Sequence, residues 1–341
     1  MTANFSISKL NTYRICGRKH YFSEMGNHGK KNPLRRKAFE LKKVQNLQMW
    51  QGSVVDLAME KLIIPLINEK KELDFGEIIN QAIGIAKRQY EFSKAKQYKE
   101  LSKNNVGDDY CVLEIHELSK PYSEEDISQV YEGIRKSILN ISEMQMPDKG
   151  ISLLNFLYRA KKLIPNISNW RVEVEDMGVK PQIDLLLYDE NFKPTVIDWK
   201  VSESLTSDYS RQLEICALTV YLKRLEKIDS PKYDYNDIQL YEVNLWQSKV
   251  KKHNFSEAIF HRIYDKIHLS INDIELLDAS KEEFRFQEIN DYILDLNVES
   301  YDITDNSGSC MFCNYNSLCQ FLIRNNNQYN EKQYLEFVQN N

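Results

Sequence analysis

Glycine is scarce in this chain: only 11 of its 341 residues are glycine. Neither the G-x4-G-K-[ST] pattern of a phosphate-binding loop nor the G-x-G-x-x-G pattern of a dinucleotide site occurs. Both patterns use glycine to bring backbone N–H groups close to phosphate oxygens. The sequence therefore argues against a built-in ATP-driven motor and against a dinucleotide cofactor.

Long hydrophobic runs are also missing. The longest aliphatic stretch, residues 62–67, is interrupted by Pro65 and is far too short to cross a bilayer, and the N-terminus lacks the apolar core of a secretory signal. We therefore expect a soluble cytoplasmic protein with no membrane partner. In that reducing compartment, the 6 cysteines favour metal ligation over disulfides. Cys111 and Cys216 have no partner at ligand spacing, so we expect both to be buried.

Three cysteines near the end of the chain have the spacing of metal ligands. They are Cys310, Cys313 and Cys319, in a C-x2-C-x5-C run, and thiolates three residues apart can point at one metal from a single turn. Cys16, near the start, is the candidate for the fourth ligand. An iron–sulfur cluster and a zinc ion both accept four cysteines, and spacing does not separate them. Either would join the chain ends and contribute folding free energy.

Charge is distributed unevenly, although the net charge is only −5. Residues 1–50 carry eleven lysines and arginines against two acidic residues, whereas residues 271–305 carry eleven acidic residues against two basic ones. A basic end can follow a nucleic-acid backbone. Alternatively, the two ends attract each other within the fold. Both interpretations stay open at this point.

The first half of the chain has mainly helical patterns. Residues 6–22 are typical of a capped helix, residues 26–38 are polar and basic and predict a loop, and residues 40–165 predict a long helical region. Breaks in that region are expected near Pro65, Gly107, Pro121 and Pro147.

The pattern changes at Trp170, where strands begin. Strands are expected at 171–175, 183–188, 195–201 and 238–245, a turn at 189–194, and helices at 205–225 and 254–279. The chemistry is expected in residues 170–212, because paired carboxylates and a lysine lie on these strands.

Asp198 and Lys200 lie two residues apart on a strand, so their side chains project from one face. Asp184 lies on the preceding strand, across a short hairpin, where it can meet Asp198. Carboxylate oxygens suit Mg²⁺ or Mn²⁺, and a lysine beside the metal can orient or help deprotonate a water and neutralise developing phosphate charge. Alternatively, Asp198 and Lys200 are a simple ion pair. Glu173 or Glu175 could add a carboxylate, or face solvent from the strand.

These residues resemble a known family. Asp184, followed by Val196-Ile-Asp-Trp-Lys200, is similar to the metal-binding core of the PD-(D/E)XK nucleases. More narrowly, it resembles the RecB-type branch that carries an iron–sulfur cluster, as in AddB and the CRISPR-associated exonucleases. The segment 6–22, with Cys16, is similar to that branch's N-terminal segment, and the C-terminal cysteine run to its remaining cluster ligands.

Two further motifs carry the resemblance. Gly52-x3-Asp56-x3-Glu60 is similar to the family's helical motif, with Asp56 where a histidine usually stands. Gln212 opens a helix similar to the Gln-x3-Tyr motif, with Cys216 in the tyrosine's place. Asp56 can still ligate Mg²⁺ or Mn²⁺, with an altered metal preference, or it is a solvated helix residue in a degraded site. The sequence also has Gly17 in place of a proline and Gln182 in place of a glycine.

The resemblance implies an α/β, restriction-endonuclease-like fold: a mixed central sheet flanked by helices, with a large helical insertion and a [4Fe–4S] cluster joining the chain ends. Zinc remains the alternative to the cluster. The expected organisation is an N-terminal helix and basic loop (1–40), a helical region (41–168), a nuclease core (169–270), a cluster segment (271–325) and a polar tail (326–341).

The implied activity is that of a metal-dependent DNA nuclease. Asp184, Asp198, Lys200 and Gln212 would be catalytic, with Gln212 orienting the substrate or the lysine, and Asp56, Asp184 and Asp198 would hold the metal. The branch favours exonuclease action on single-stranded or end-containing DNA, in repair, recombination or defence against mobile DNA. A helicase or another protein subunit is a candidate partner. The competing hypotheses are an inactive nuclease-like module that binds nucleic acid or a partner, and a zinc-stabilised scaffold.

Overall fold

The structure is a computed structural model. It describes residues 4–5, 7–25, 33–175, 177–203, 209–226, 233–270, 301–325 and 331–339. The chain divides into two units by its internal contacts. The first comprises Met1–Phe5, Gln45–Tyr110 and Pro121–Ser270, and the second Ser6–Val44, Cys111–Lys120 and Ile271–Asn341.

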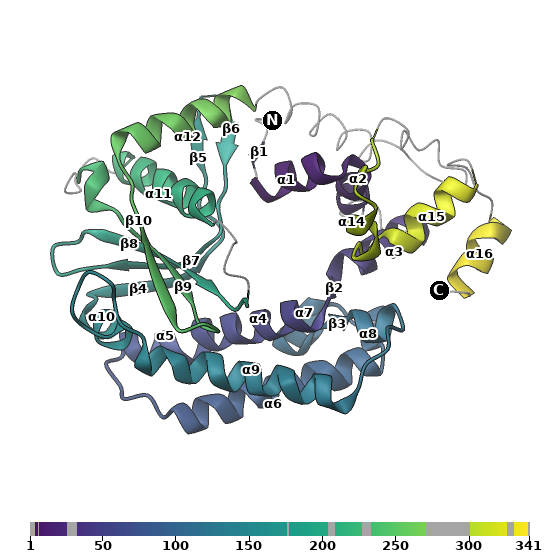
Figure 1. Ribbon diagram of the computed structural model, residues 1–341, viewed down its shortest axis with the longest axis horizontal. Coiled ribbons are helices and arrows are strands. Elements are labelled where there is room, and N and C mark those ends of the chain that lie inside the picture. The colour runs from purple at the N-terminus through teal and green to yellow at the C-terminus, as the bar shows by residue number, and fades with distance from the viewer. Residues whose placement is uncertain are drawn as a thin grey trace. The chain divides into compact units, whose positions relative to one another are not determined.

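A mixed five-stranded sheet forms the centre of the first unit (Figure 1). Its strand order is β10-β9-β8-β7-β4. The pair β8 and β9 is parallel, and the other neighbouring pairs are antiparallel. The strands are β4 (Lys162–Ile167), β7 (Ile183–Tyr188), β8 (Pro194–Lys200), β9 (Gln239–Asn244) and β10 (Lys249–His253). The mixed central sheet expected from the sequence is therefore confirmed.

The β7–β8 hairpin aligns the strands that carry the expected carboxylates. In its turn, the Asp189 side chain accepts hydrogen bonds from the backbone N–H groups of Asn191 (2.9 Å) and Lys193 (2.8 Å). The ladder then pairs Leu185 with Ile197. Every residue of β8 before Lys200 is buried, as in a strand covered on both faces. The register continues toward Asp184 and Asp198.

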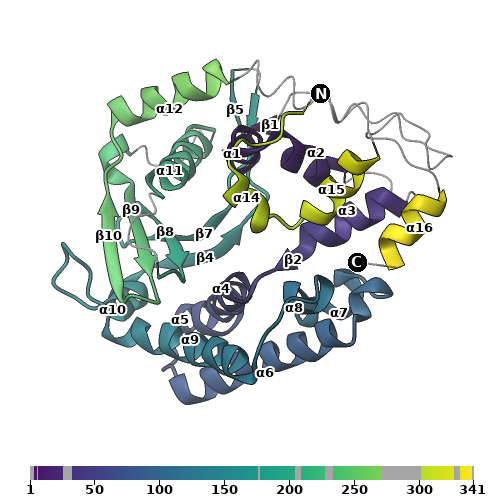
Figure 2. The ribbon, with the colours of Figure 1, turned by 45° about the vertical axis from the view of Figure 1, so that its right-hand side comes forward.

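Helices cover both faces of this sheet (Figures 1 and 2). On one side lie α11 (Ser210–Leu225) and α12 (Glu257–Leu269). On the other lie α4 (Leu47–Ala58), the π-helical turn η1 (Met59–Ile63), α5 (Ile64–Asn68) and α9 (Glu124–Glu143). No helix within the described residues is long and apolar enough to cross a membrane.

The expected break at Pro65 does not occur. The chain passes from α4 through η1 into α5 without leaving a helical path. Pro65 sits in the first turn of α5, where its missing N–H group costs little. The wider turn just before it is of the kind often found at functional sites.

The helical region packs closely because its helices are amphipathic and well capped. Asn46 caps α4 by accepting from the Met49 N–H group at 2.7 Å, and Ser123 and Asp126 form a capping box on α9. A Cβ atom on Gly133 would lie 2.3 Å from the Gln51 side chain, so glycine permits α4 and α9 to approach. The remaining elements of this region are α6 (Phe75–Lys94), η2 (Gln97–Lys99), α7 (Lys103–Val106), η3 (Gly107–Asp109) and α10 (Leu153–Arg159).

The strand expected at 171–175 exists but does not belong to the central sheet. It is β5 (Val172–Val174), which pairs with β6 (Met177–Val179), and β6 pairs in parallel with β1 (Asn4–Phe5). β6 follows β5 in the chain and pairs with it in antiparallel fashion. The chain therefore leaves the central sheet after β4 and rejoins it only at β7. The short η4 (Tyr235–Asp237) precedes β9.

The second unit, which begins at Ser6 and includes the C-terminal segment, differs locally from expectation. The single helix expected over 6–22 is two helices, α1 (Ile7–Ile15) and α2 (Gly17–Met25), interrupted at Cys16. At the break, the Arg18 N–H group donates to the Asp302 carbonyl at 3.1 Å. A Cβ atom at Gly17 would lie 3.1 Å from the Asp302 nitrogen. A distant segment therefore fixes this end of α2.

Part of the loop expected over 26–38 is helical. Helix α3 spans Pro33–Lys43, with proline at the first position, where helices favour it. Leu34, Ala38 and Leu41 are fully buried at helical spacing, which explains the helix despite its many charges. Residues 26–32 lie outside the described part. The other elements are β2 (Val44–Gln45), β3 (Val112–Leu113), α8 (Glu114–Glu117), α14 (Ser307–Met311), α15 (Asn316–Arg324) and α16 (Glu331–Gln339).

Candidate active site

Asp198 and Lys200 lie side by side at the end of β8. The Lys200 Nζ atom is 2.5 Å from Asp198 Oδ2, and their side chains are 16% and 5% exposed. Lys200 Nζ also lies 4.5 Å above the ring of Tyr209, the residue before α11. The lysine is therefore held between a carboxylate and an aromatic face.

Gln212 completes the contacts of Asp198. It projects from the first turn of α11, and its Nε2 donates a hydrogen bond to Asp198 Oδ1 at 2.9 Å. One turn further along, the buried Cys216 thiol donates to the Gln182 carbonyl at 3.5 Å. Helix α11 thus contacts both the end of β8 and the segment before β7, as the expected Gln212 position requires.

Asp184 lies next to this pair. Its Oδ2 accepts a hydrogen bond from the Trp199 backbone N–H group at 3.0 Å, and the like charge of Asp198 acts on its carboxyl group. Burial, followed by the like charges of Asp198 and Asp56, raises the pKa of Asp184 to about 8. Burial also raises the pKa of Asp198, although Lys200 opposes the effect. At neutral pH and without a cation, Asp184 is therefore largely protonated.

Lys200 stays charged in this setting. Burial lowers the pKa of its ammonium group, but the carboxylates of Asp198 and Asp184 outweigh burial and raise the pKa overall. Lys200 is consequently a fixed positive charge at the site and is not a base at neutral pH.

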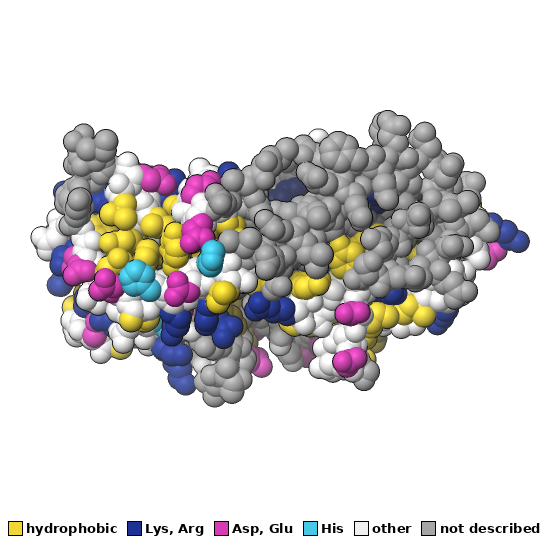
Figure 3. Space-filling model, turned by 90° about the horizontal axis from the view of Figure 1, so that it is seen from above, with side chains coloured by type: hydrophobic (Ala, Val, Ile, Leu, Met, Phe, Trp, Pro, Cys, Tyr) yellow, Lys and Arg dark blue, Asp and Glu magenta, His cyan; other side chains and the backbone are white. Residues whose placement is uncertain are grey.

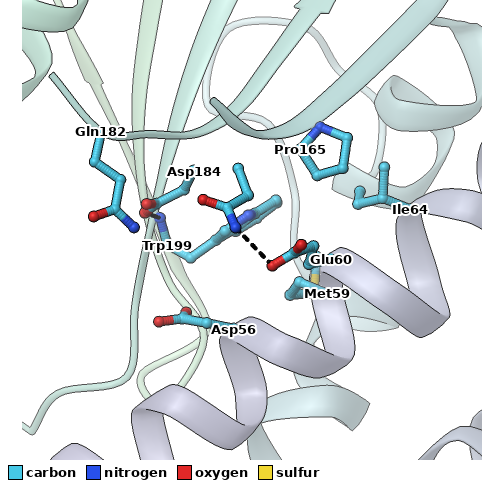
Figure 4. Close-up of a pocket in the computed structure, with 9 residues that line it drawn as sticks. Asp56, Met59, Glu60, Ile64, Pro165, Gln182, Asp184 and Trp199 are labelled. Atoms are coloured by element: carbon cyan, nitrogen blue, oxygen red, sulfur yellow. Dashed lines mark hydrogen bonds between the residues drawn. The ribbon is translucent and has the colours of Figure 1, made fainter. Parts of the chain in front are cut away.

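Asp56 faces these strands from α4. It lines a recess of about 80 Å³ that Asp184 and Trp199 border on the other side (Figure 4). Water reaches the Asp56 side chain, which is exposed. The protein surrounding its carboxyl group, together with the charges of Asp198 and Glu60, nevertheless raises its pKa to about 6, against the effect of Lys200. Asp56 therefore ionises more readily than Asp184.

The recess also contains contacts that the sequence did not predict. Glu60 lies one helical turn after Asp56, and its Oε2 accepts a hydrogen bond from Asn166 Nδ2 at 2.9 Å (Figure 4). Asn166 adopts a left-handed backbone with φ of 49°, which asparagine tolerates better than most residues. No sequence pattern pointed to Asn166 or to Tyr209. Both owe their places to the tertiary fold.

Glu173 and Glu175 are engaged elsewhere. Glu173 Oε1 lies 3.0 Å from Arg171 Nη2 within β5 and its approach, and Glu175 forms an ion pair with His268 at the end of α12. Neither is among the residues that line the recess.

The acidic residues suit a hard divalent cation by their chemistry. Carboxylate oxygens are the ligands that Mg²⁺ and Mn²⁺ prefer, and the charges of Asp198 and Asp56 both act on Asp184. Within the described ranges, however, no set of three or more acidic, histidine or cysteine side chains is arranged around one ion position. The contacts explain this, because Lys200 and Gln212 engage Asp198 while the Trp199 backbone engages Asp184.

The four expected cluster cysteines all lie in the second unit, although the described side chains do not surround a single ion position there. Burial raises the pKa of Cys313, and the charges of Cys16 and Cys310 act on it in the same direction. Burial also raises the pKa of Cys319. The charges of Cys16 and Cys313 raise this pKa further, whereas a hydrogen bond from Arg18 lowers it. The Lys19 N–H group donates to Cys16 Sγ at 3.4 Å. A backbone N–H donor to a cysteine sulfur, as at Cys16, is compatible with a thiolate-bound metal or cluster.

Several basic residues of the N-terminal segment are paired within the second unit. Lys9 Nζ lies 2.8 Å from Glu24 Oε1, and Lys37 Nζ lies 2.7 Å from Glu117 Oε1. These acids are not in the acidic segment 271–305, of which 271–300 lies outside the described part. In the left half of Figure 3, basic, acidic and histidine side chains are interspersed around a hydrophobic patch. The described surface in that half of the figure therefore carries charges of both signs.

A family model of the PD-(D/E)XK nuclease superfamily matches residues 4–320. The chain therefore belongs to the PD-(D/E)XK nuclease superfamily. No curated protein matches the sequence.

Proposed function

We propose that this protein is a metal-dependent DNA nuclease. The observation that carries the proposal is the arrangement around Asp198. This buried carboxylate contacts Lys200, Gln212 and Asp184 at the end of a central strand, in a chain of a nuclease superfamily. Burying charged and amide groups together at one strand end costs folding free energy. Such a cluster is therefore typical of a functional site.

Each residue has a separate role in the proposed reaction. Asp184, Asp198 and Asp56 would hold Mg²⁺ or Mn²⁺, which, when bound, polarises a phosphoryl oxygen and lowers the pKa of a coordinated water. Lys200 supplies a permanent positive charge that stabilises the negative charge developing on the phosphate. Gln212 keeps the Asp198 carboxylate in one orientation.

The proposed substrate is DNA that is single-stranded or has free ends, cleaved as by an exonuclease. The support is the resemblance to the RecB-type branch, which also suggests a role in DNA repair, recombination or defence, with a helicase or another protein subunit as partner. Substrates labelled at either end separate exonuclease from endonuclease action, because an exonuclease releases mononucleotides or short products from one end first.

We further propose that Cys16, Cys310, Cys313 and Cys319 hold a [4Fe–4S] cluster with a structural role. The support is the C-x2-C-x5-C spacing of the last three cysteines and the resemblance of both chain ends to the RecB-type branch. Protein purified without oxygen should be brown, with broad visible absorption and iron and sulfide in equal amounts. A colourless protein with stoichiometric zinc would contradict the cluster and support the alternative metal.

The nuclease activity is tested with end-labelled single- and double-stranded DNA, and RNA, in Mg²⁺ and in Mn²⁺. Asp198→Ala and Lys200→Ala should each abolish cleavage without altering the fold or the metal content of the second unit. Lys193→Ala is the matched control, because Lys193 also forms an ion pair, with Asp237 at 2.5 Å, but at the other end of the β7–β8 hairpin.

If wild-type protein cleaves none of these substrates with either metal, the enzymatic proposal fails. Retained DNA binding with weak metal binding would then favour the second candidate, a nuclease-like module that binds nucleic acid or a partner. The observation favouring that candidate is Asp56, which stands where the family usually has histidine.

A further inference from the structure

The turn between β9 and β10 lies beside the proposed catalytic lysine. Asn244, the last residue of β9, is the register partner of Lys200. The next residue, Leu245, donates its N–H group to the Lys200 carbonyl at 2.7 Å. Trp246 comes next in the sequence. Its backbone therefore lies about 5 Å, the spacing of neighbouring strands, from the segment that follows Lys200.

Three amide side chains fix this turn in place. Asn244 Nδ2 donates to the Ser202 carbonyl at 2.9 Å, and Gln247 Nε2 donates to the Glu203 carbonyl at 2.8 Å. From α9, Asn140 Nδ2 donates to the Leu245 carbonyl at 2.6 Å. Trp246 is thus held between two anchored residues. A surface turn attached at both sides presents its side chain with little loss of entropy on binding.

The indole of Trp246 is partly exposed and has a cation over it. Lys136 Nζ, from the exposed side of α9, lies 4.4 Å from the ring centroid. A second exposed lysine, Lys249, is the register partner of Asn244, so Lys200, Asn244 and Lys249 form a row on one face of three strands. Neither Lys136 nor Lys249 has a recorded acidic partner among the described residues.

A partly exposed aromatic ring beside cations that have no acidic partner is the combination that binds single-stranded nucleic acid. A base stacks on the ring, and lysines contact the phosphates on either side. Duplex DNA cannot use such a face, because its bases are already stacked and paired.

We propose that Trp246, with Lys136 and Lys249, is a binding subsite for an unpaired nucleotide of the substrate next to the bond that is cleaved. The base stacks on Trp246, and the two lysines contact backbone phosphates. The subsite rests on the proposed nuclease function and specifies its substrate as a strand that is single at this point.

The test measures binding in EDTA, so that cleavage plays no part. A dye-labelled 12-nucleotide single strand and the matching duplex are titrated with the full-length protein, with fluorescence anisotropy as the readout. Trp246→Leu keeps an apolar side chain but removes the aromatic face. It should weaken single-strand binding by about tenfold or more and duplex binding much less. Lys136→Ala should lower the salt dependence of single-strand binding by about 0.7 in the log–log slope.

The chain contains a matched control pair. Lys161 Nζ lies 3.8 Å over the ring of Phe192, which is 45% exposed, in the β7–β8 turn at the other end of β8 from Lys200. Phe192→Leu should bind both DNAs as wild type does. Trp246→Phe, which keeps a smaller aromatic face, should fall between wild type and Trp246→Leu.

The proposal is overturned if Trp246→Leu binds the single strand as tightly as wild type, or if Phe192→Leu weakens binding equally. It is also overturned if Trp246→Leu loses single strand and duplex to the same extent, or if it loses binding only through unfolding while Trp246→Phe binds normally. Failure of the nuclease proposal is separate, because it appears in the cleavage assay with Mg²⁺ or Mn²⁺ and not in EDTA.

Discussion

Gln212 donates a hydrogen bond from its side-chain amide to the Asp198 carboxylate, with 2.9 Å between Nε2 and Oδ1. Because Lys200 occupies the other oxygen of Asp198 at 2.5 Å, both oxygens have a charged or polar neighbour on the protein side. The orientation of the carboxylate is therefore fixed before any ligand arrives. Preorganisation of this kind lets a site act on a developing charge without rearranging.

Gln212→Ala should lower kcat by about tenfold, which corresponds to losing one hydrogen bond to a charged group. KM should change little, since Gln212 is proposed to orient Asp198 and not to bind DNA. Gln212→Glu should be worse than Gln212→Ala, because it places a second negative charge against Asp198. Steady-state cleavage of one labelled DNA by the three proteins measures this. A glutamate variant as active as wild type would show that the amide does not orient Asp198.

The strands and the helix that form this site could be predicted from local patterns. β7 and β8 have alternating or buried apolar residues around a clear turn, and Gln212 begins a strongly helical stretch, so the approach of Asp184 to Asp198 followed from hairpin geometry. Their proposed roles in catalysis stay predictions. Asn166 and Tyr209 were not foreseen, because their positions depend on contacts between elements far apart in the sequence.

Other elements were missed for equally physical reasons. β10 (Lys249–His253) has only one aliphatic residue, Val250, as edge strands often do, so its pattern resembles a solvated loop. The break at Cys16 depends on Asp302, which lies 286 residues away. The sequence of residues 6–22 alone does not distinguish one continuous helix from two helices whose junction contacts a distant segment.

Metal binding at the acidic site should release protons. At pH 7, Asp184, with a pKa of about 8, is largely protonated in the absence of metal, whereas a metal ligand must be ionised. Binding of Mn²⁺ or Mg²⁺ should thus release roughly one proton at pH 7 and fewer at pH 9, and affinity should rise with pH up to about 8. Calorimetric titrations in two buffers with different ionisation enthalpies measure the release.

The control for proton release is Asp184→Asn, which has no proton to lose at this position. It should bind metal more weakly and release fewer protons at pH 7 than wild type. Identical heats in both buffers for wild-type protein at pH 7 would show that Asp184 is already ionised. That result would contradict the raised pKa of Asp184.

Asp56→His should preserve cleavage and change the metal preference. Asp56 is one of the charges that raise the pKa of Asp184, so its replacement by neutral histidine should let Asp184 ionise at lower pH. Imidazole is a poorer ligand than carboxylate for Mg²⁺ and suits transition metals better. The ratio of Mg²⁺-supported to Mn²⁺-supported cleavage should therefore fall relative to wild type.

Asp56→Ala is the comparison for Asp56→His, because it removes the ligand altogether and should lose activity with both metals. If all three proteins cleave DNA equally well with each metal, Asp56 is a solvated helix residue with no part in metal binding. That result would leave Asp184 and Asp198 as the carboxylates that hold the ion.

The second unit contains a buried ion pair whose loss should destabilise it. Lys37 Nζ lies 2.7 Å from Glu117 Oε1, and their side chains are only 8% and 1% exposed. Lys37→Ala would leave the Glu117 charge buried without its partner, at a cost of about 3–5 kcal/mol. Replacing both residues, as in Lys37→Met with Glu117→Leu, should restore much of that stability, because it removes both charges.

Arg36→Ala is the control: Arg36 pairs with Glu40 at 3.3 Å on the exposed side of the same helix, so its loss should cost less than about 1 kcal/mol. Urea unfolding monitored by far-UV circular dichroism measures the loss of stability. If Lys37→Ala unfolds at the same urea concentration as Arg36→Ala, the buried pair does not stabilise the second unit.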